Sequence, residues 1–305
     1  MSSRPLAATL SAVLGLALAL TGPTALARAD SPAPPPAPTR AAAPALPVIY
    51  AHRGASAYAP ENTVDSIDEA ARRGATWIEN DVQRTKDGVL VVIHDETLAR
   101  TTDVRQLFPD RSPWRVADFT SEEIALLDAG SWYHPRFKGA RVPTLREFLA
   151  RLDRHRLGLL MEIKNPRLYP GVEEQILGEL DDAGWLGGSR LRTRLVIQSF
   201  DSDSVRTVHA LRPEVATAFL GMPAVEDLPE FTAFADRINP PHVSITAEWM
   251  TAVHKLTGAH GRRMAVDAWT VDNATAARRV RDLGVDGIIS NRPDTVRDAL
   301  TTEPK

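Results

Sequence analysis

The chain has 305 residues, of which 43% are hydrophobic and 25% are charged, a composition typical of a globular protein with a full core. Its 36 basic and 39 acidic residues give a formal charge of -3, which argues against nucleic acid or an anionic membrane surface as a partner. The chain has no cysteine, which excludes disulfides, thiolate metal sites, cysteine nucleophiles and a cysteine-linked lipid anchor, so any metal must be bound by oxygen or imidazole.

The N-terminus has the pattern of an export signal. Arg4 precedes an apolar run over residues 6–20, and Gly22, Pro23 and the small residues around Ala27 and Ala29 follow it. A membrane anchor is the alternative, but the run is shorter than the roughly 20 apolar residues needed to span a bilayer. We therefore expect residues 1–29 to be a cleaved signal peptide and the product to be secreted. Cleavage after Ala29 removes two arginines, and 34 basic against 39 acidic residues leave a charge of -5.

Residues 30–47 are rich in proline and alanine. Seven of the chain's 23 prolines lie between Ser31 and Pro47, with few side chains able to build a core. We expect this segment to be an extended, solvated linker. The folded domain is then predicted over residues 48–300, with a short tail at 301–305.

Short apolar runs recur from Val48 onward, and amphipathic stretches follow most of them, as in alternating strands and helices. Eight runs predict strands at 48–51, 77–79, 159–161, 195–197, 215–220, 243–245, 264–266 and 287–289. Six stretches predict helices at 64–73, 145–154, 172–183, 202–211, 247–257 and 274–283. Eight such units in about 250 residues match an α/β fold of the (β/α)8 TIM barrel type. A doubly wound sheet is the alternative, but residues 51–55 lack the G-x-G-x-x-G loop that follows its first strand.

A ninth apolar run, residues 89–93, follows the dipeptide Asp87-Gly88, which is a strong hairpin signal. We read residues 81–95 as a β-hairpin whose two-residue turn pairs 86 with 89, 83 with 92 and 81 with 94. This register places His94 opposite Asp81, whereas a three-residue turn would shift it by one and turn His94 away. Residues 101–143 show no strand–helix repeat and are predicted to be an insertion on the same rim, over the site.

Three carboxylates are the candidate metal ligands. Glu79 and Asp81 are two residues apart, so both project to one face of a strand, and Glu162 ends a further predicted strand. Barrel enzymes place their chemistry at the C-terminal ends of strands. Oxygen ligands favour calcium or magnesium, allow manganese, and favour zinc less, because zinc sites usually recruit histidine or cysteine. Ligation by His52 or His94 would allow zinc and stays open.

The candidate catalytic residues are His52 and His94, which follow apolar runs beside charged residues and can move protons near neutral pH. Arg53 and Lys164 supply cations for a phosphate. Asp95 is the neighbour of His94 on a predicted strand and should point away from it, so no role is assigned. Three residues at strand ends are candidates for lining the pocket, with barrel packing as the alternative reading: Gln198, Phe200 and Trp269.

These residues resemble the glycerophosphodiester phosphodiesterase family of secreted bacterial type. The shared motifs, which cover about residues 48–300, are His52-Arg53-Gly54, Pro60-Glu61-Asn62-Thr63, Glu79-x-Asp81, Lys86-Asp87-Gly88, His94-Asp95, Glu162-Ile163-Lys164, Gln198-Ser199-Phe200, Trp269-Thr270-Val271 and Asp286-Gly287. The resemblance implies a barrel with a small insertion, a divalent metal on the three carboxylates, and paired acid–base roles for the two histidines. It implies hydrolysis of a small glycerophosphodiester, such as glycerophosphocholine or glycerophosphoethanolamine, to glycerol 3-phosphate and an alcohol.

The sequence departs from the family pattern at two places. Asp272 stands where asparagine is usual, and Ser290-Asn291 replaces the commoner threonine-aspartate. Both positions are expected near the rim, where they would affect headgroup preference more than the reaction.

Three other functions are weighed against this one. A phospholipase D or sphingomyelinase D acting on intact lipid would use similar residues and expose apolar side chains such as Trp132, Tyr133 and Phe137. A non-catalytic binding module would not need both histidines. A glycosidase also pairs carboxylates in a barrel but has no need of two phosphate-binding cations. The preferred alcohol, the oligomeric state and the attacking hydroxyl, from water or from the glycerol 2-position, stay open.

Overall fold

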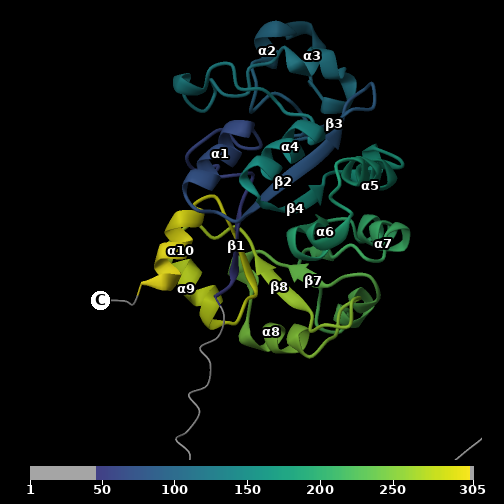
Figure 1. Ribbon diagram of the computed structural model, residues 1–305, viewed down its shortest axis with the longest axis vertical. Helices are drawn as coiled ribbons and strands as arrows, with labels where there is room; N and C mark the ends of the chain where they lie inside the picture. The colour runs from purple at the N-terminus through teal and green to yellow at the C-terminus, as the bar shows by residue number, and fades with distance from the viewer. Residues whose placement is uncertain (1–45, 303–305) are drawn as a thin grey trace, which may run out of the picture. The chain divides into compact units, whose positions relative to one another are not determined.

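Eight parallel strands close into a barrel in the computed structural model, which describes residues 46–302 (Figure 1). The predicted signal peptide, most of the predicted linker and residues 303–305 lie outside these residues. The barrel strands follow one another around the sheet, and β1 pairs with both β9 and β2, which closes the ring. They are β1 (Val48–Ala51), β2 (Trp77–Arg84), β4 (Gly158–Ile163), β5 (Leu195–Ser199), β6 (Thr217–Leu220), β7 (Arg237–Asn239), β8 (Ala265–Ala268) and β9 (Gly287–Ser290). The predicted TIM barrel is confirmed.

Amphipathic helices surround the strands and pack their apolar faces on the outer side of the barrel. Six of them match predicted helices: α1 (Val64–Arg72), α4 (Leu145–His155), α5 (Val172–Asp182), α7 (Ser202–Leu211), α8 (Ala247–His254) and α9 (Ala274–Asp282). Two were not predicted, α6 (Gly188–Arg194) and α10 (Pro293–Thr301). No helix within residues 46–302 is long and apolar enough to cross a membrane.

The strand predicted at residues 243–245 is wrong. The seventh barrel strand is β7, and residues His242–Ser244 form a turn of 3-10 helix in which Val243 is 72% exposed. β7 has no apolar run because two of its three side chains are polar and form hydrogen bonds with other barrel strands, one adjacent and one two strands away. Arg237 donates to Asp267 on β8, and the Asn239 amide donates to Gln198 on β5. A search for apolar runs therefore passes over this strand.

The predicted hairpin exists, but its register differs by one residue from the prediction. The short strand β3 (Leu90–Val92) pairs antiparallel with the end of β2, with Gln83 opposite Val91. The turn contains three residues, Lys86, Asp87 and Gly88, because the amide of Thr85 bonds the carbonyl of Val89. Gly88 has φ of 87°, the left-handed conformation that closes three-residue hairpin loops. Asp81 is therefore not opposite His94 in the ladder.

Residues 101–143 form a small layer beyond β3, at the end of the molecule where α2 (Val104–Leu107) and α3 (Ser121–Ala125) are labelled in Figure 1. They share a separate apolar cluster with Val91 and Ile93 of the hairpin region. The Asp87 carboxylate in the hairpin turn accepts hydrogen bonds from the amide and hydroxyl of Ser121. The segment thus packs on the hairpin, and none of its residues lines the two cavities at the site described below.

Candidate active site

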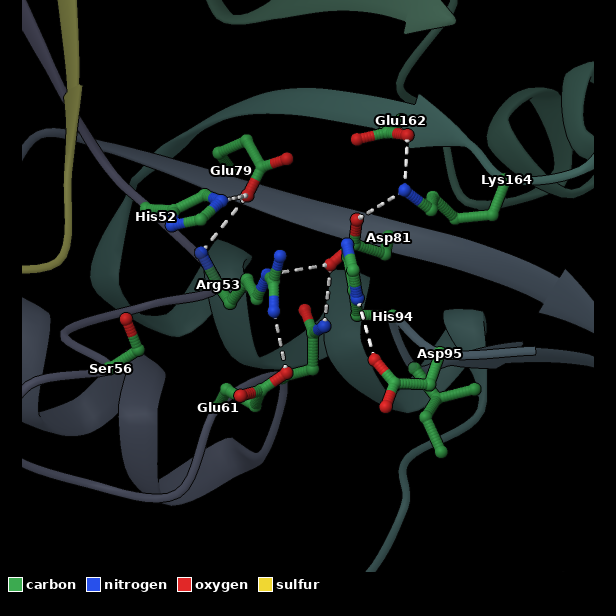
Figure 2. A network of polar contacts seen from close by, with 12 residues as sticks. His52, Arg53, Ser56, Glu61, Glu79, Asp81, His94, Asp95, Glu162 and Lys164 are labelled. Carbon is green, nitrogen blue, oxygen red and sulfur yellow. Dashed lines mark hydrogen bonds and ion pairs between the residues drawn. The ribbon is translucent and has the colours of Figure 1, made fainter. Parts of the chain in front are cut away.

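Three buried carboxylates meet at the C-terminal mouth of the barrel. Glu79 and Asp81 of β2 and Glu162 of β4 each offer an oxygen, and these oxygens lie within 4.8 Å of one another (Figure 2). The two strands are paired so that Asp81 lies beside Glu162. The spacing of two along β2 thus places two carboxylates inside the barrel, as predicted, and the neighbouring strand adds the third.

Two cations lie against this carboxylate cluster. The Nε atom of Arg53 lies 3.3 Å from Asp81, and its backbone amide donates to Glu79 at 3.0 Å. The Nζ atom of Lys164 lies 2.7 Å from Glu162 and 3.8 Å from Asp81. Three buried carboxyl groups thus face two positive charges.

Burial and mutual repulsion shift the pKa values of the three carboxylic acids. Burial, followed by the charges of Asp81 and Glu162, raises the pKa of Glu79 well above its usual value. Burial and then Asp81 raise the pKa of Glu162 to about 8. Burial also acts to raise the pKa of Asp81, but Arg53 and Lys164 outweigh it and hold that pKa at about 2. The positive charges of Arg53 and Lys164 are therefore too few to stabilise all three carboxylates in the ionised form.

The residues present fit a divalent cation. Asp81 Oδ1 is buried and has no hydrogen-bond partner, because Nζ of Lys164 lies 3.8 Å from it, too far for a hydrogen bond. Buried acceptors without a donor are costly and rare in proteins. An ion held by Glu79, Asp81 and Glu162 would supply both the missing charge and the missing partner, and an all-oxygen set suits calcium, magnesium or manganese.

The loop after β1 brings His52 and Arg53 to the cluster. Arg53 has φ of 55° and Gly54 has φ of 81°, so the chain turns sharply at these two residues. A side chain at position 54 would lie 2.2 Å from the hydroxyl of Ser66 on α1, which leaves room only for glycine. The Nε2 atom of His52 lies 3.9 Å from Glu79. Burial and the charge of Arg53 lower the pKa of His52 to about 4, so its imidazole is neutral at pH 7.

His94 reaches the site although the predicted register is wrong. The strand β3 ends at Val92, and His94 lies in a bend beyond the ladder, where strand parity no longer fixes its direction. The buried side-chain amide of Gln83 holds this bend by donating to the carbonyls of Ile93, His94 and Asp95 at 3.0, 3.1 and 2.6 Å. His94 lines the same cavity as His52 and Glu79.

Asp95, to which the sequence assigned no role, contacts His94. Its carboxylate lies 2.8 Å from Nδ1 of His94 (Figure 2). It also accepts a hydrogen bond from Arg100. The expectation that it points away is wrong because the segment is not a strand here. Arg100 binds Glu61, which also binds Arg53 at 2.8 Å. A chain of ion pairs thus links the surroundings of both histidines.

Two residues of the motif Pro60-Glu61-Asn62-Thr63 were quoted from the sequence without a role, and the structure gives them contacts. Glu61 pairs with Arg53, and the amide of Asn62 donates to Asp81 at 2.8 Å. Asn62 has φ of 59°, a conformation that asparagine tolerates better than most residues. Sequence order alone does not show that this loop folds back onto β2.

Two adjoining cavities open at the site. The smaller, about 90 Å³, is lined by both histidines, Arg53, Lys164 and two of the carboxylates, and it also touches Gln198, Phe200 and Trp269. The larger, about 500 Å³, shares Glu162, Lys164 and Phe200 with it and extends over the loops after β4 and β5. Phe200 is 51% exposed, and its ring meets that of Trp269 edge to face. The amide of Gln198 is engaged by Glu79 and Asn239, so it holds a carboxylate in place.

Comparison with known proteins identifies the family. A model of the glycerophosphoryl diester phosphodiesterase family matches residues 52–295. The chain belongs to this family. A glycerophosphodiester phosphodiesterase of Bacillus subtilis is 36% identical over 258 residues, covering 80% of this chain and 83% of that protein. One of Caldanaerobacter subterraneus is 35% identical over 253 residues, covering 82% and 96%.

A solved relative has the same fold. The phosphodiesterase of Oleispira antarctica in complex with its product sn-glycerol-3-phosphate is 27% identical, with a TM-score of 0.68 over 84% of this chain and 98% of that chain. This member of the glycerophosphoryl diester phosphodiesterase family is therefore a phosphoric diester hydrolase built on a TIM barrel.

The two departures from the family pattern lie beside His52. The side-chain oxygen of Asn291 accepts a hydrogen bond from His52 Nδ1 at 2.7 Å, and Asp272 accepts two hydrogen bonds from Asn291. Asn291 thus contacts a candidate catalytic histidine and Asp272 contacts Asn291, while the expected effect on headgroup preference stays a prediction.

Proposed function

We propose that the protein hydrolyses small glycerophosphodiesters, such as glycerophosphocholine and glycerophosphoethanolamine, to sn-glycerol 3-phosphate and an alcohol with the aid of a divalent cation. The observation that carries this proposal is the mouth of the barrel, where a buried carboxylate cluster, two cations and two imidazoles line one cavity of about 90 Å³. The family match and the product complex of the Oleispira antarctica relative support it.

The cation would be held by Glu79, Asp81 and Glu162, with calcium or magnesium favoured, manganese acceptable and zinc less suited. When bound, it would supply positive charge to a phosphodiester whose own charge grows in the transition state. Arg53 and Lys164 add fixed positive charge at the same place. Both are held by carboxylates, Arg53 by Glu61 and Lys164 by Glu162, so little reorganisation is needed when a phosphate binds.

The two histidines divide the proton transfers. His52 is neutral at pH 7, and its Nε2 atom faces the carboxylate cluster, so it is suited to take a proton from the attacking hydroxyl. His94 lies across the cavity with Asp95 at Nδ1, an arrangement suited to giving a proton to the leaving alkoxide. Each transfer contributes about 10²- to 10⁴-fold in typical enzymes. The larger cavity beside Phe200 offers room for the part of the substrate beyond the phosphate.

The test is a panel of glycerophosphodiesters assayed for glycerol 3-phosphate after EDTA treatment and readdition of calcium, magnesium, manganese or zinc. We expect turnover that EDTA abolishes and a hard cation restores. Glu79→Gln should remove activity, while Glu226→Gln, an exposed glutamate outside the site, should not. Release of choline from phosphatidylcholine vesicles instead would favour a lipid enzyme. No hydrolysis with any cation would favour a binding module.

We also propose that the folded domain of residues 48–300 is exported after cleavage near Ala27 or Ala29. The support is the apolar run with its small-residue sites and the proline-rich segment that follows. N-terminal sequencing of the protein from culture medium tests this. An intact N-terminus on a protein retained in the cytoplasm would contradict it.

A further inference from the structure

Three neighbouring strands each contribute, just beyond the C-terminal end, one residue to a chain of hydrogen bonds that ends on His52. His52 follows β1, Asn291 follows β9 and Asp272 lies beyond β8, and these strands are adjacent in the barrel. His52 Nδ1 lies 2.7 Å from Asn291 Oδ1.

The carboxylate of Asp272 fixes the direction of the Asn291 amide. One of its oxygens accepts from the backbone amide of Asn291 at 2.8 Å, and the other accepts from the side-chain Nδ2 at 2.7 Å. A carboxylate only accepts, so the group of Asn291 that faces it must be the NH₂. Rotating the amide by half a turn would bring two oxygens together at this distance.

The direction of the amide in turn fixes the proton on His52. Asn291 Oδ1 faces away from Asp272 and accepts from the hydroxyl of Ser56 at 2.7 Å. An amide oxygen cannot donate, so His52 Nδ1 must carry a hydrogen at its 2.7 Å contact with this oxygen. A neutral imidazole has one hydrogen, and Nε2, which faces Glu79, is therefore unprotonated.

We propose that Asp272 and Asn291 are positioning residues that lock His52 in the Nδ1–H tautomer and so keep Nε2 free to accept the proton of the attacking hydroxyl. The role of His52 as the base rests on the proposed function. The tautomer of His52 does not, because it follows from the hydrogen bonds alone. Asp272 touches neither substrate nor the carboxylate cluster in the contacts described; it acts through Asn291.

The side-chain amide of Asn291 lies between the Asp272 carboxylate and the His52 imidazole. In the family pattern the two residue types are exchanged, with asparagine at position 272 and aspartate at position 291. Each order leaves an acceptor on His52 Nδ1, so exchanging the two residues together preserves the tautomer. Changing 272 alone frees the direction of the Asn291 amide, and changing 291 alone sets two carboxylates against each other where Asn291 and Asp272 now lie 2.7 Å apart. The pair is therefore expected to behave as a unit.

The direct test is the protonation of the His52 ring nitrogens in the full-length protein, read from long-range ¹H–¹⁵N correlation spectra at pH 7 with EDTA and with calcium. The His52 signals are assigned by their loss in His52→Gln. We expect hydrogen on Nδ1 and none on Nε2 in the wild type. A hydrogen on Nε2 would overturn the proposal, whether or not the protein hydrolyses any glycerophosphodiester.

The variant test uses Asp272→Asn, Asn291→Asp and the double variant. Asp272→Asn permits both directions of the Asn291 amide, so we expect mixed tautomers and a fall in kcat of about 10- to 100-fold with little change in KM. The double variant should recover one tautomer and most of kcat. Asp298→Asn on α10, an exposed Asp→Asn change, is the matched control and should keep the wild-type kcat.

The outcomes separate a positioning role from a structural one. If Asp272 only stabilised the rim, Asp272→Asn would lower the thermal midpoint without altering the His52 tautomer, and the double variant would not recover kcat. Either result would overturn the proposal. If Asp272→Asn does not fold, Asn291→Ala, which removes the acceptor on Nδ1, should give mixed tautomers instead. A wild type with the expected tautomer but no hydrolysis would contradict only the proposed function.

Discussion

Two fully buried amides on β2 differ in their hydrogen bonding. Gln83 donates to three carbonyls and accepts from the hydroxyl of Tyr169, so its amide is satisfied. Asn80 is completely buried, yet neither its oxygen nor its nitrogen has a partner. Its neighbours on the same face, Ile78 and Val82, belong to the main apolar cluster between the barrel and its helices. Asn80 is therefore a polar side chain in an apolar position.

Replacing Asn80 by leucine should stabilise the protein. Leucine has the same branching and buries no unpaired polar atom, and an unsatisfied buried group costs about 1–3 kcal/mol. We expect Asn80→Leu to raise the free energy of unfolding by about 1–2 kcal/mol in urea titrations. Gln83→Leu is the matched control on the same strand. It should lower the free energy of unfolding, because the substitution leaves three carbonyls without a donor. Equal destabilisation by both changes would show that Asn80 has partners.

Removing the imidazole of His94 should remove one proton transfer. We expect His94→Ala to lower kcat by about 10²- to 10⁴-fold on glycerophosphocholine. Asp95→Asn keeps an acceptor beside His94 Nδ1 and should cost less. His155→Ala is the control, because His155 binds Asp68 on the outer helices. If His94→Ala turned over glycerophosphocholine at the wild-type rate, His94 would have no role in the mechanism.

At the scale of elements, apolar patterning predicts a strand well only where several apolar residues stand together in the sequence. It located seven barrel strands but not β7, whose sequence Arg237-Ile238-Asn239 serves a polar barrel interior. The hairpin was predicted from Asp87-Gly88, but that dipeptide fits a two-residue or a three-residue turn equally well. In the structure Asp87 accepts from the hydroxyl of Thr85 within the turn and from Ser121, 34 positions away, and the second contact could not be read from the sequence.

The segment 101–143 contains a turn organised by one carboxylate, Asp128. This side chain accepts from the backbone amides of Gly130, Ser131 and Gly139. Burial acts to raise the pKa of Asp128, but these amides outweigh it and lower the pKa to about 2. Because the folded pKa lies below the unfolded value of about 3.8, this stabilisation is complete above pH 4 and is lost as the pH falls toward 2.

The variant Asp128→Asn should therefore lose stability in a pH-dependent way. We expect a deficit of about 1–2 kcal/mol relative to the wild type at pH 7, since a charged acceptor is replaced by a neutral one in a partly exposed turn. The deficit should shrink at pH 4 and again at pH 3. Urea titrations of both proteins at the three pH values give this difference directly. A deficit that stayed constant would mean that the charge of Asp128 does not matter.

At the scale of the whole molecule, the barrel joins site residues that are far apart in sequence. The convergence of the three carboxylates and both histidines was predictable, because each lies on or after a recognisable strand run and the C-terminal ends of parallel strands meet. The residues that hold them were not, because Asn62, Gln83 and Asn291 act through tertiary contacts that leave no local pattern. The sequence thus predicted which charged residues and histidines meet at the mouth of the barrel better than it predicted the polar residues that hold them in place.

The carboxylate cluster should also couple cation binding to the stability of the whole domain. Three buried acids, two with raised pKa values, repel one another when no cation balances them. An ion that binds only the folded state stabilises it by about 2.7 kcal/mol at 100 times its dissociation constant. For a domain of this size that corresponds to a rise in Tm of about 5–10 °C. Calorimetry of the EDTA-treated protein with increasing calcium or magnesium measures this rise in Tm.

Variants decide whether that rise comes from the cluster. Glu79→Gln removes one repelling charge, so without cation it should be at least as stable as the wild type, yet it should gain little from calcium or magnesium. Asp128→Asn lies outside the cluster and should show the full cation-dependent rise from a lower starting Tm. If Glu79→Gln gained as much as the wild type, the cation would bind elsewhere, and Glu79, Asp81 and Glu162 would not form the metal site.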